Sequence, residues 1–139
     1  MVDDILKKYP NDVKLVIKNF PLSFHKQAMK AAQYVMAADN QGKFYDMYKK
    51  VMENYRGLKA NEDLPLQFAE ELGLDIEKLK RDSASPVIAN QIQTEMDELK
   101  NSGIPRMSVP KFLINGKEPQ GRSLAAFSAM IDTELKKKK

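Results

Sequence analysis

The sequence predicts an α/β fold in the order strand, series of helices, β-hairpin and final helix. From residue 13 onward, Val13, Leu15 and Ile17 lie on one face and Lys14 and Lys18 on the other, which is the period-two pattern of a strand. From residue 23 to residue 101, apolar residues recur at spacings of three and four, as they do on the buried face of a helix. Asn115-Gly116 follows a short apolar stretch at 111–114, and this dipeptide is typical of two-residue hairpin turns.

Capping residues and glycines place the helices along the chain. Ser23, Asp75, Ser85 and Ser123 each precede an amphipathic stretch, and their side-chain oxygens are expected to accept from free amides of the first turn. Pro86 suits the first helical position because its missing N–H costs no hydrogen bond there. The expected helices cover residues 2–9, 23–40, 41–54, 61–72, a short stretch after Asp75, 85–101 and 123–135.

Composition excludes several classes of function. The chain of 139 residues contains no cysteine, which excludes disulfides, thiolate catalysis and cysteine-zinc sites. His25 is the single histidine and cannot form a multi-histidine metal site. We therefore predict no catalytic residue, no metal site and no cofactor in this chain.

Charge and hydropathy exclude other partners. Four of the 23 basic residues are the lysines at 136–139, which leaves 19 basic against 19 acidic residues and gives no expectation of nucleic-acid binding. No stretch of about 18 apolar residues is present, so no membrane span is expected. No basic-then-apolar leader precedes Asp3, and as written the chain is expected to stay in the cytoplasm.

Other chemically suggestive residues are expected to be structural. His25 lies near Ser23, but nothing marks the third group or the oxyanion site that a nucleophilic pair needs. Four methionines have helical spacing that favours core packing over a soft peptide-binding groove. These are Met29, Met36, Met47 and Met52.

Four segments in order resemble the DsbA-like branch of the thioredoxin superfamily over nearly the whole chain. The first, at 9–32, reads YPNDVKLVIKNFPLSFHKQAMKAA and is similar to a strand, a junction and the first inserted helix of that family. The others are QGKFYDMY at 41–48, VPKFLING at 109–116, which resembles the family's cis-proline strand, and the closing helix at 124–135.

The resemblance implies a thioredoxin-like fold with a large helical insertion. A single domain, 1–139, would comprise a thioredoxin-like part at 1–20 and 103–139 and an insertion at 21–102. Members begin with a central strand and a Cys-x-x-Cys motif at the start of the first helix, whereas this chain opens inside that helix. We therefore expect a truncated member, without the redox motif, of a family that is typically periplasmic or extracytoplasmic.

The resemblance also implies a binding site at Val109 and Pro110. A cis peptide there would turn the backbone of Val109 toward a cleft in which an extended peptide or protein substrate pairs as an added strand. The alternative is a trans proline that starts an edge strand. The approach at 103–110 is longer than the usual family sequence.

Three functions follow as hypotheses. The first is a disulfide-oxidoreductase family domain without thiol chemistry in this chain. The alternatives are a non-catalytic peptide-binding or chaperone-like module and a fragment of a glutathione-dependent transferase or isomerase of the kappa-like branch. Because the missing central strand would leave sheet edges unpaired, we also expect a homodimer or other self-association.

Overall fold

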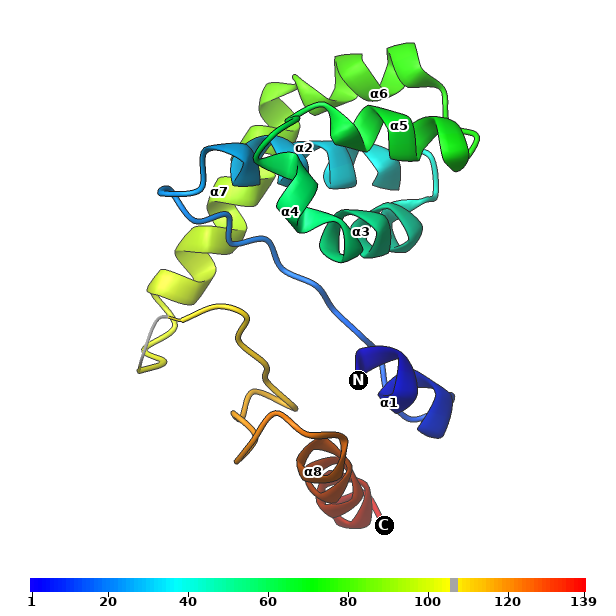
Figure 1. Cartoon of the computed structure of the whole chain (residues 1–139). Helices are drawn as coiled ribbons and strands as arrows, with labels where there is room; N and C mark the ends of the chain where they lie inside the picture. The colour runs from blue at the N-terminus through cyan, green and yellow to red at the C-terminus, as the bar shows by residue number, and fades with distance from the viewer. Residues whose placement is uncertain (106–107) are drawn as a thin grey trace. The chain divides into compact units, whose positions relative to one another are not determined.

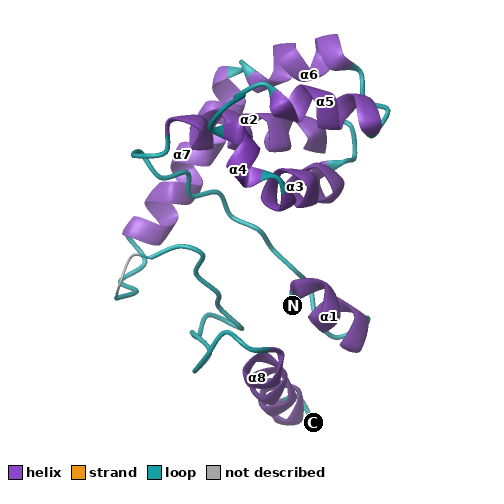
Figure 2. Cartoon of the chain, viewed as in Figure 1, coloured by secondary structure: helices purple, strands orange, loops and turns teal. Residues whose placement is uncertain are grey.

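The computed structural model describes residues 1–105 and 108–139, and within those ranges every regular element is a helix (Figures 1 and 2). The helices are α1 (Val2–Lys8), α2 (Lys26–Asp39), α3 (Phe44–Glu53), α4 (Tyr55–Leu58), α5 (Leu64–Glu71), α6 (Ile76–Ser83), α7 (Pro86–Lys100) and α8 (Leu124–Lys137). No helix in the described part of the chain is both long and apolar enough to cross a membrane.

The predicted α/β, thioredoxin-like sheet is absent from the described residues, so the fold-class prediction is wrong. Residues 13–17 and 111–113 contain no helix, turn or bend, and neither segment pairs with a neighbouring strand. We call them the two open segments of the chain. The described part contains a single isolated antiparallel bridge, between Ile114 and Lys117. A strand exists only when a partner completes its ladder of hydrogen bonds, and the alternating pattern of one segment cannot supply that partner.

The chain divides into two compact units. Unit 1 comprises residues 1–17 and 106–139, and unit 2 comprises residues 18–105. Unit 2 contains α2 to α7, whereas unit 1 contains α1 and α8, the first and last helices of the chain. The expectation that 21–102 is an insertion into a family domain stays a prediction.

Unit 2 is built around α2. This helix packs against α3, α5, α6 and α7, and its Ala37 and Ala38 are fully buried. Small side chains allow neighbouring helices to approach closely, and alanine is also the best helix former. The large side chains that fill the rest of this core include Met47 of α3, Leu79 of α6 and Ile92 of α7, each with no exposed surface.

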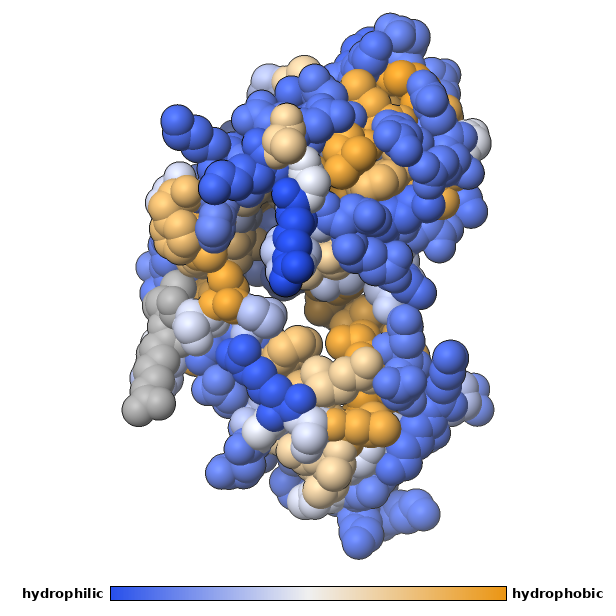
Figure 3. Space-filling model, viewed as in Figure 1, coloured by the Kyte–Doolittle hydropathy of each residue, from blue (hydrophilic) through white to orange (hydrophobic). Residues whose placement is uncertain are grey.

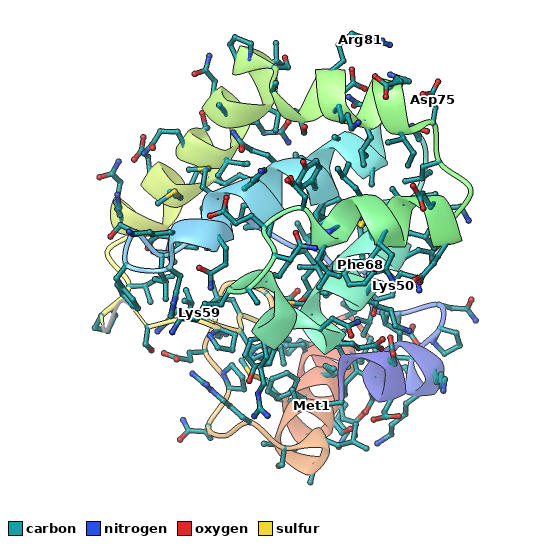
Figure 4. All side chains as sticks on the ribbon, turned by 45° about the horizontal axis from the view of Figure 1, so that its top comes forward. Met1, Lys50, Lys59, Phe68, Asp75 and Arg81 are labelled. Atoms are coloured by element: carbon teal, nitrogen blue, oxygen red, sulfur yellow. The ribbon has the colours of Figure 1, made fainter. Side chains whose placement is uncertain are left out.

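The contact between α3 and α5 combines charge with an aromatic ring. The ammonium of Lys50 lies 5.8 Å from the ring centroid of Phe68, and Figure 4 shows the two side chains beside each other. The same ammonium forms an ion pair with Glu71, one turn further along α5. Phe68 is buried, so the lysine stem also covers the edge of the core.

Three of the four predicted helix caps are confirmed. The carboxylate of Asp75, labelled in Figure 4, accepts from the Lys78 amide at 2.9 Å at the start of α6. Ser85 accepts from Val87 N at 3.2 Å, and Ser123 accepts from Ala126 N at 3.1 Å. Ser23 does not cap: α2 begins at residue 26, with His25 at the cap position and no side-chain capping bond.

Unit 1 has its own small core. Ile5 of α1 and Tyr9, which directly follows α1, pack against Phe127 and Ile131 of α8, and all four are buried. Val13, Phe112, Ile114 and Leu135 cover this cluster from outside. The segments at 13–17 and 111–114 therefore both pack against this apolar cluster, which forms the floor of the space between them.

Candidate functional site

The predicted site residues directly precede the open segment at 111–113 of unit 1. The peptide bond between Val109 and Pro110 is cis, Val109 is half-buried and Pro110 is exposed. Two residues of the predicted approach loop, Arg106 and Met107, lie outside the described residues. Because proline has no N–H, the backbone at residue 110 offers only an acceptor to a neighbouring chain.

The turn after this segment is as predicted. Asn115 and Gly116 have φ values of 49° and 78°, so both central residues of the turn lie in the left-handed region. The Ile114 amide donates to the Lys117 carbonyl at 2.8 Å, and the Lys117 amide donates back at 3.1 Å. The two residues Asn115 and Gly116 thus form the hairpin turn, and in the described part of the chain the bridge between Ile114 and Lys117 is the one pair that the hairpin contains.

Lys111 anchors the segment next to Pro110. Its side chain is only 4% exposed, and its ammonium lies 3.1 Å from Glu118 Oε1 on the far side of the turn. A buried ammonium needs such a partner, since an unpaired one would carry a large desolvation cost. The ion pair therefore holds residues 111 and 118 together where the sheet ladder is missing.

A groove of about 370 Å³ lies within unit 1. Both open segments line it, and α1 and α8 supply the rest of the lining. Its lining residues are Val2, Ile5, Leu6, Asp12, Val13, Lys14, Leu15, Val16, Lys111, Phe112, Leu113, Ile114, Asn115, Phe127, Ile131, Glu134, Leu135 and Lys138. Val109 and Pro110 precede this groove in the chain and do not line it.

Apolar side chains are exposed along the groove. Leu15, Val16 and Leu113 have 36%, 62% and 42% of their surface exposed, and hydrophobic surface interrupts the hydrophilic exterior in the space-filling view (Figure 3). Beneath them, the rings of Phe112 and Phe127 pack edge to face with centroids 5.2 Å apart. Exposed apolar side chains that gather around one concave site mark a binding surface more often than isolated ones do.

The backbone along the groove is also unpaired. In the described part of the chain, no hydrogen bond reaches the N–H or C=O groups of residues 14–17, nor those of Phe112 and Leu113. Such rows of free donors and acceptors are what an exposed strand edge presents to another chain. The groove therefore combines an apolar floor with two unsatisfied backbone segments.

The charged residues of the groove leave a positive excess. Glu134 accepts from Lys137 at 2.6 Å and from Asn115 at 3.2 Å; these bonds and the charge of Lys117 lower the pKa of Glu134 to about 2. Its carboxylate is thus already neutralised by neighbours. Lys14, Lys138 and Asp12 are exposed and form no ion pair within the described residues. The described lining of the groove therefore carries two unpaired ammonium groups and one unpaired carboxylate.

The other residues considered from the sequence lie outside this groove. His25 is exposed beside Phe24, with ring centroids 4.6 Å apart. Met36 and Met47 are buried in the core of unit 2, as predicted, whereas Met29 and Met52 are 37% and 51% exposed.

Sequence reasoning missed the groove itself. It treated residues 13–17 and 111–114 as strands whose unpaired edges would lead to self-association, and it gave α1 no functional part. The available signal was the missing central strand, which was used only to predict self-association. The sequence alone does not show that both segments pack on the same apolar cluster and leave a groove between them.

Comparison with known proteins gives the family. Residues 1–133 match the family described as Thioredoxin. The chain is 29% identical over 119 residues to the Na(+)/H(+) antiporter NhaA of Herminiimonas arsenicoxydans, a match that covers 86% of the chain and 18% of the antiporter. It is 30% identical over 132 residues to the Na(+)/H(+) antiporter NhaA 3 of Salinispora tropica, covering 94% of the chain and 20% of that protein.

The chain thus spans about a fifth of the length of the curated relatives it matches. No solved structure matches the chain. Its resemblance to thioredoxin-superfamily proteins is confirmed at the level of the family, through a match that covers nearly all of its 139 residues. The chain belongs to the thioredoxin family.

Proposed function

We propose that this chain is a DsbA-like domain that binds extended polypeptide and performs no thiol chemistry of its own. The observation that carries the proposal is the combination, in one unit, of the Val109-Pro110 segment with an apolar groove, in a chain without cysteine. Disulfide exchange requires a thiolate that attacks a disulfide sulfur, and no residue of this chain supplies one. What remains of the family activity is recognition of the polypeptide substrate.

Thioredoxin-family membership and the order of the four resembling segments support the DsbA-like assignment. The backbone supports the binding role. Pro110 is exposed and has no N–H, so a chain that approaches this residue meets a carbonyl acceptor without a competing donor. Exposed Leu113, three residues further on, offers apolar contact to the same chain.

The test is binding of reduced and carboxymethylated α-lactalbumin, an unfolded protein whose thiols are blocked. We expect saturable binding by the full chain and a loss of about tenfold in affinity for Pro110→Ala, because alanine restores an N–H and frees φ. Pro10→Ala is the matched control, since Pro10 is an exposed proline of the same unit. Equal affinity in both variants would contradict the proposed site.

Insulin reduction is a second test, and it addresses the claim that the chain performs no thiol chemistry. We expect no turnover above that of a boiled sample, because the chain contains no cysteine. Measured turnover would overturn the non-catalytic assignment, whatever the binding result.

The relatives favour a second function. Because the named relatives are Na(+)/H(+) antiporters and the match spans only about a fifth of each, we propose that domains of this kind serve as accessory domains of such antiporters. The test is Na⁺/H⁺ exchange in membrane vesicles that contain the Herminiimonas arsenicoxydans antiporter with and without its matching region. We expect altered exchange when the region is removed and restoration when this chain is supplied in its place. Unchanged exchange in both samples would contradict an accessory role.

A further inference from the structure

We propose that the groove of unit 1 is completed by a β-strand from another protein, with apolar residues on alternate positions and acidic residues among the polar positions between them. This inference rests on the proposed polypeptide-binding function and gives it a site and a partner chemistry. The site is the groove lined by residues 12–16 and 111–115, next to Pro110 but distinct from it.

The free backbone determines the conformation of the partner. Residues 14–17 and Phe112 to Leu113 present N–H and C=O groups that bind nothing in the described chain. A compact ligand can satisfy one or two such groups, whereas a row of alternating donors and acceptors is matched by an extended backbone. A strand added to either segment would supply the ladder whose absence leaves the unit without a sheet.

The floor of the groove determines which side chains face inward. Phe127 and Ile131 of α8 are buried below it, and Leu15, Val16 and Leu113 leave apolar surface exposed beside it. Successive residues of a strand point to opposite faces, so every second residue of the partner meets this apolar surface. We therefore expect alternation of apolar and polar residues in the partner.

The unpaired lysines of the groove favour acidic residues on the partner strand, and the net charge of unit 1 disfavours a second copy of this chain. Among the described residues, Lys14, Lys138 and Asp12 of the groove have no ion-pair partner, whereas Glu134 is held by Lys137, Asn115 and Lys117, so two unpaired lysines outnumber one unpaired carboxylate. Across unit 1, the sequence has eleven basic and six acidic residues, a formal charge of +5. Two copies that joined through this unit would repel each other, while acidic residues on a different chain would be attracted.

The experiment is an NMR titration of the full, ¹⁵N-labelled chain with three synthetic peptides. The first is Glu-Val-Thr-Val-Thr-Val-Glu with blocked ends. The second carries N-methyl groups on alternate amides, and in the third lysines replace both glutamates. We expect the N-methylated peptide to bind about tenfold more weakly or worse, because it loses two or more backbone bonds. The lysine peptide should bind about threefold more weakly at low salt, and this difference should vanish at high salt.

Neutral variants locate the site without changing its charge. Val16→Asn and Leu113→Asn remove exposed apolar surface of the groove and should each weaken the first peptide about tenfold. Val87→Asn is the matched control, because Val87 is 73% exposed on α7 of unit 2 and lies outside the groove. Since these residues are exposed, all three variants should fold.

The outcomes separate this inference from the function on which it rests. Equal binding of the N-methylated peptide, or unchanged binding by both groove variants, would overturn strand addition in the groove. If unfolded α-lactalbumin binding still depends on Pro110, the proposed function survives that result. If the first peptide binds the groove while α-lactalbumin does not bind, the broader function fails instead. A concentration-dependent dimer abolished by Val16→Asn would identify a second copy as the occupant and would overturn the choice of partner.

Discussion

The hydroxyl of Tyr9 donates to Asp132 Oδ1 at 2.7 Å and links the end of α1 to the middle of α8. Tyr9 is buried and its partner is a carboxylate, so this bond is among the stronger side-chain bonds of unit 1. We expect Tyr9→Phe to lower the free energy of unfolding of unit 1 by about 1.5 kcal/mol. Urea unfolding followed by the Ile131 methyl resonance measures this change.

Tyr55→Phe is the control for that measurement. Tyr55 is 55% exposed and, among the described residues, accepts only from neighbouring Arg56 at 3.2 Å, so its substitution should change stability by less than about 0.5 kcal/mol. Equal effects of the two substitutions would show that the contact between α1 and α8 does not depend on the Tyr9 hydroxyl.

Two serines of unit 2 test the capping geometry. Ser85→Ala removes the acceptor for Val87 N and should destabilise unit 2 by about 1 kcal/mol. Ser23→Ala should have little effect, because α2 begins at residue 26 and Ser23 caps nothing. Chemical denaturation followed by helical circular dichroism compares the two variants, and a larger loss for Ser23→Ala would refute the observed start of α2.

The centre of unit 2 should be sensitive to cavity formation. Ile92 is fully buried on α7, so Ile92→Ala should lower the unfolding free energy of unit 2 by about 3 kcal/mol through lost burial and an unfilled cavity. Val87→Ala on the same helix should cost less than about 0.5 kcal/mol, since Val87 is exposed. The Ile88 methyl resonance during urea unfolding reports both changes, and similar losses would contradict the observed core.

Glu134 makes the stability of unit 1 depend on pH. Hydrogen bonds from Lys137 and Asn115, with the charges of nearby lysines, lower its pKa from the ordinary value of 4.5 to about 2. Because the folded pKa is below the unfolded one, the stabilisation is complete above about pH 5 and is lost as the pH falls from 4.5 toward 2. Glu134→Gln should therefore be less stable than the wild type at pH 6, with the gap closing by pH 2. Parallel stability curves for the two proteins would contradict this role.

The helical part of the fold was accessible from the sequence because its signals are local. Asp75 and Ser85 precede amphipathic stretches, and each caps the helix that the pattern predicts. The turn at Asn115-Gly116 was also predictable, since its geometry depends on two residues that tolerate positive φ. The short helix α4 was missed, because four residues offer no periodicity to detect.

The sheet could not be predicted in the same way. The alternation at residues 13–17 shows that the two faces of the segment differ, but strand formation depends on a partner elsewhere in space. The choice of Val109 and Pro110 as site residues stays a prediction, and the neighbouring groove could not be predicted because it depends on how α1 and α8 pack. The expected homodimer or other self-association stays a prediction, and light scattering over a range of concentrations tests it.

Amide hydrogen exchange at residues 14–16, Phe112 and Leu113 tests the central claim most directly. Their N–H groups bind nothing in the described chain, so they should exchange rapidly in the free protein. Addition of the acidic, alternating peptide should slow exchange at every second N–H of at least one segment, the pattern of a paired strand edge. Saturated peptide binding with unchanged exchange at all of these amides would contradict the claim that the groove is completed by an added strand.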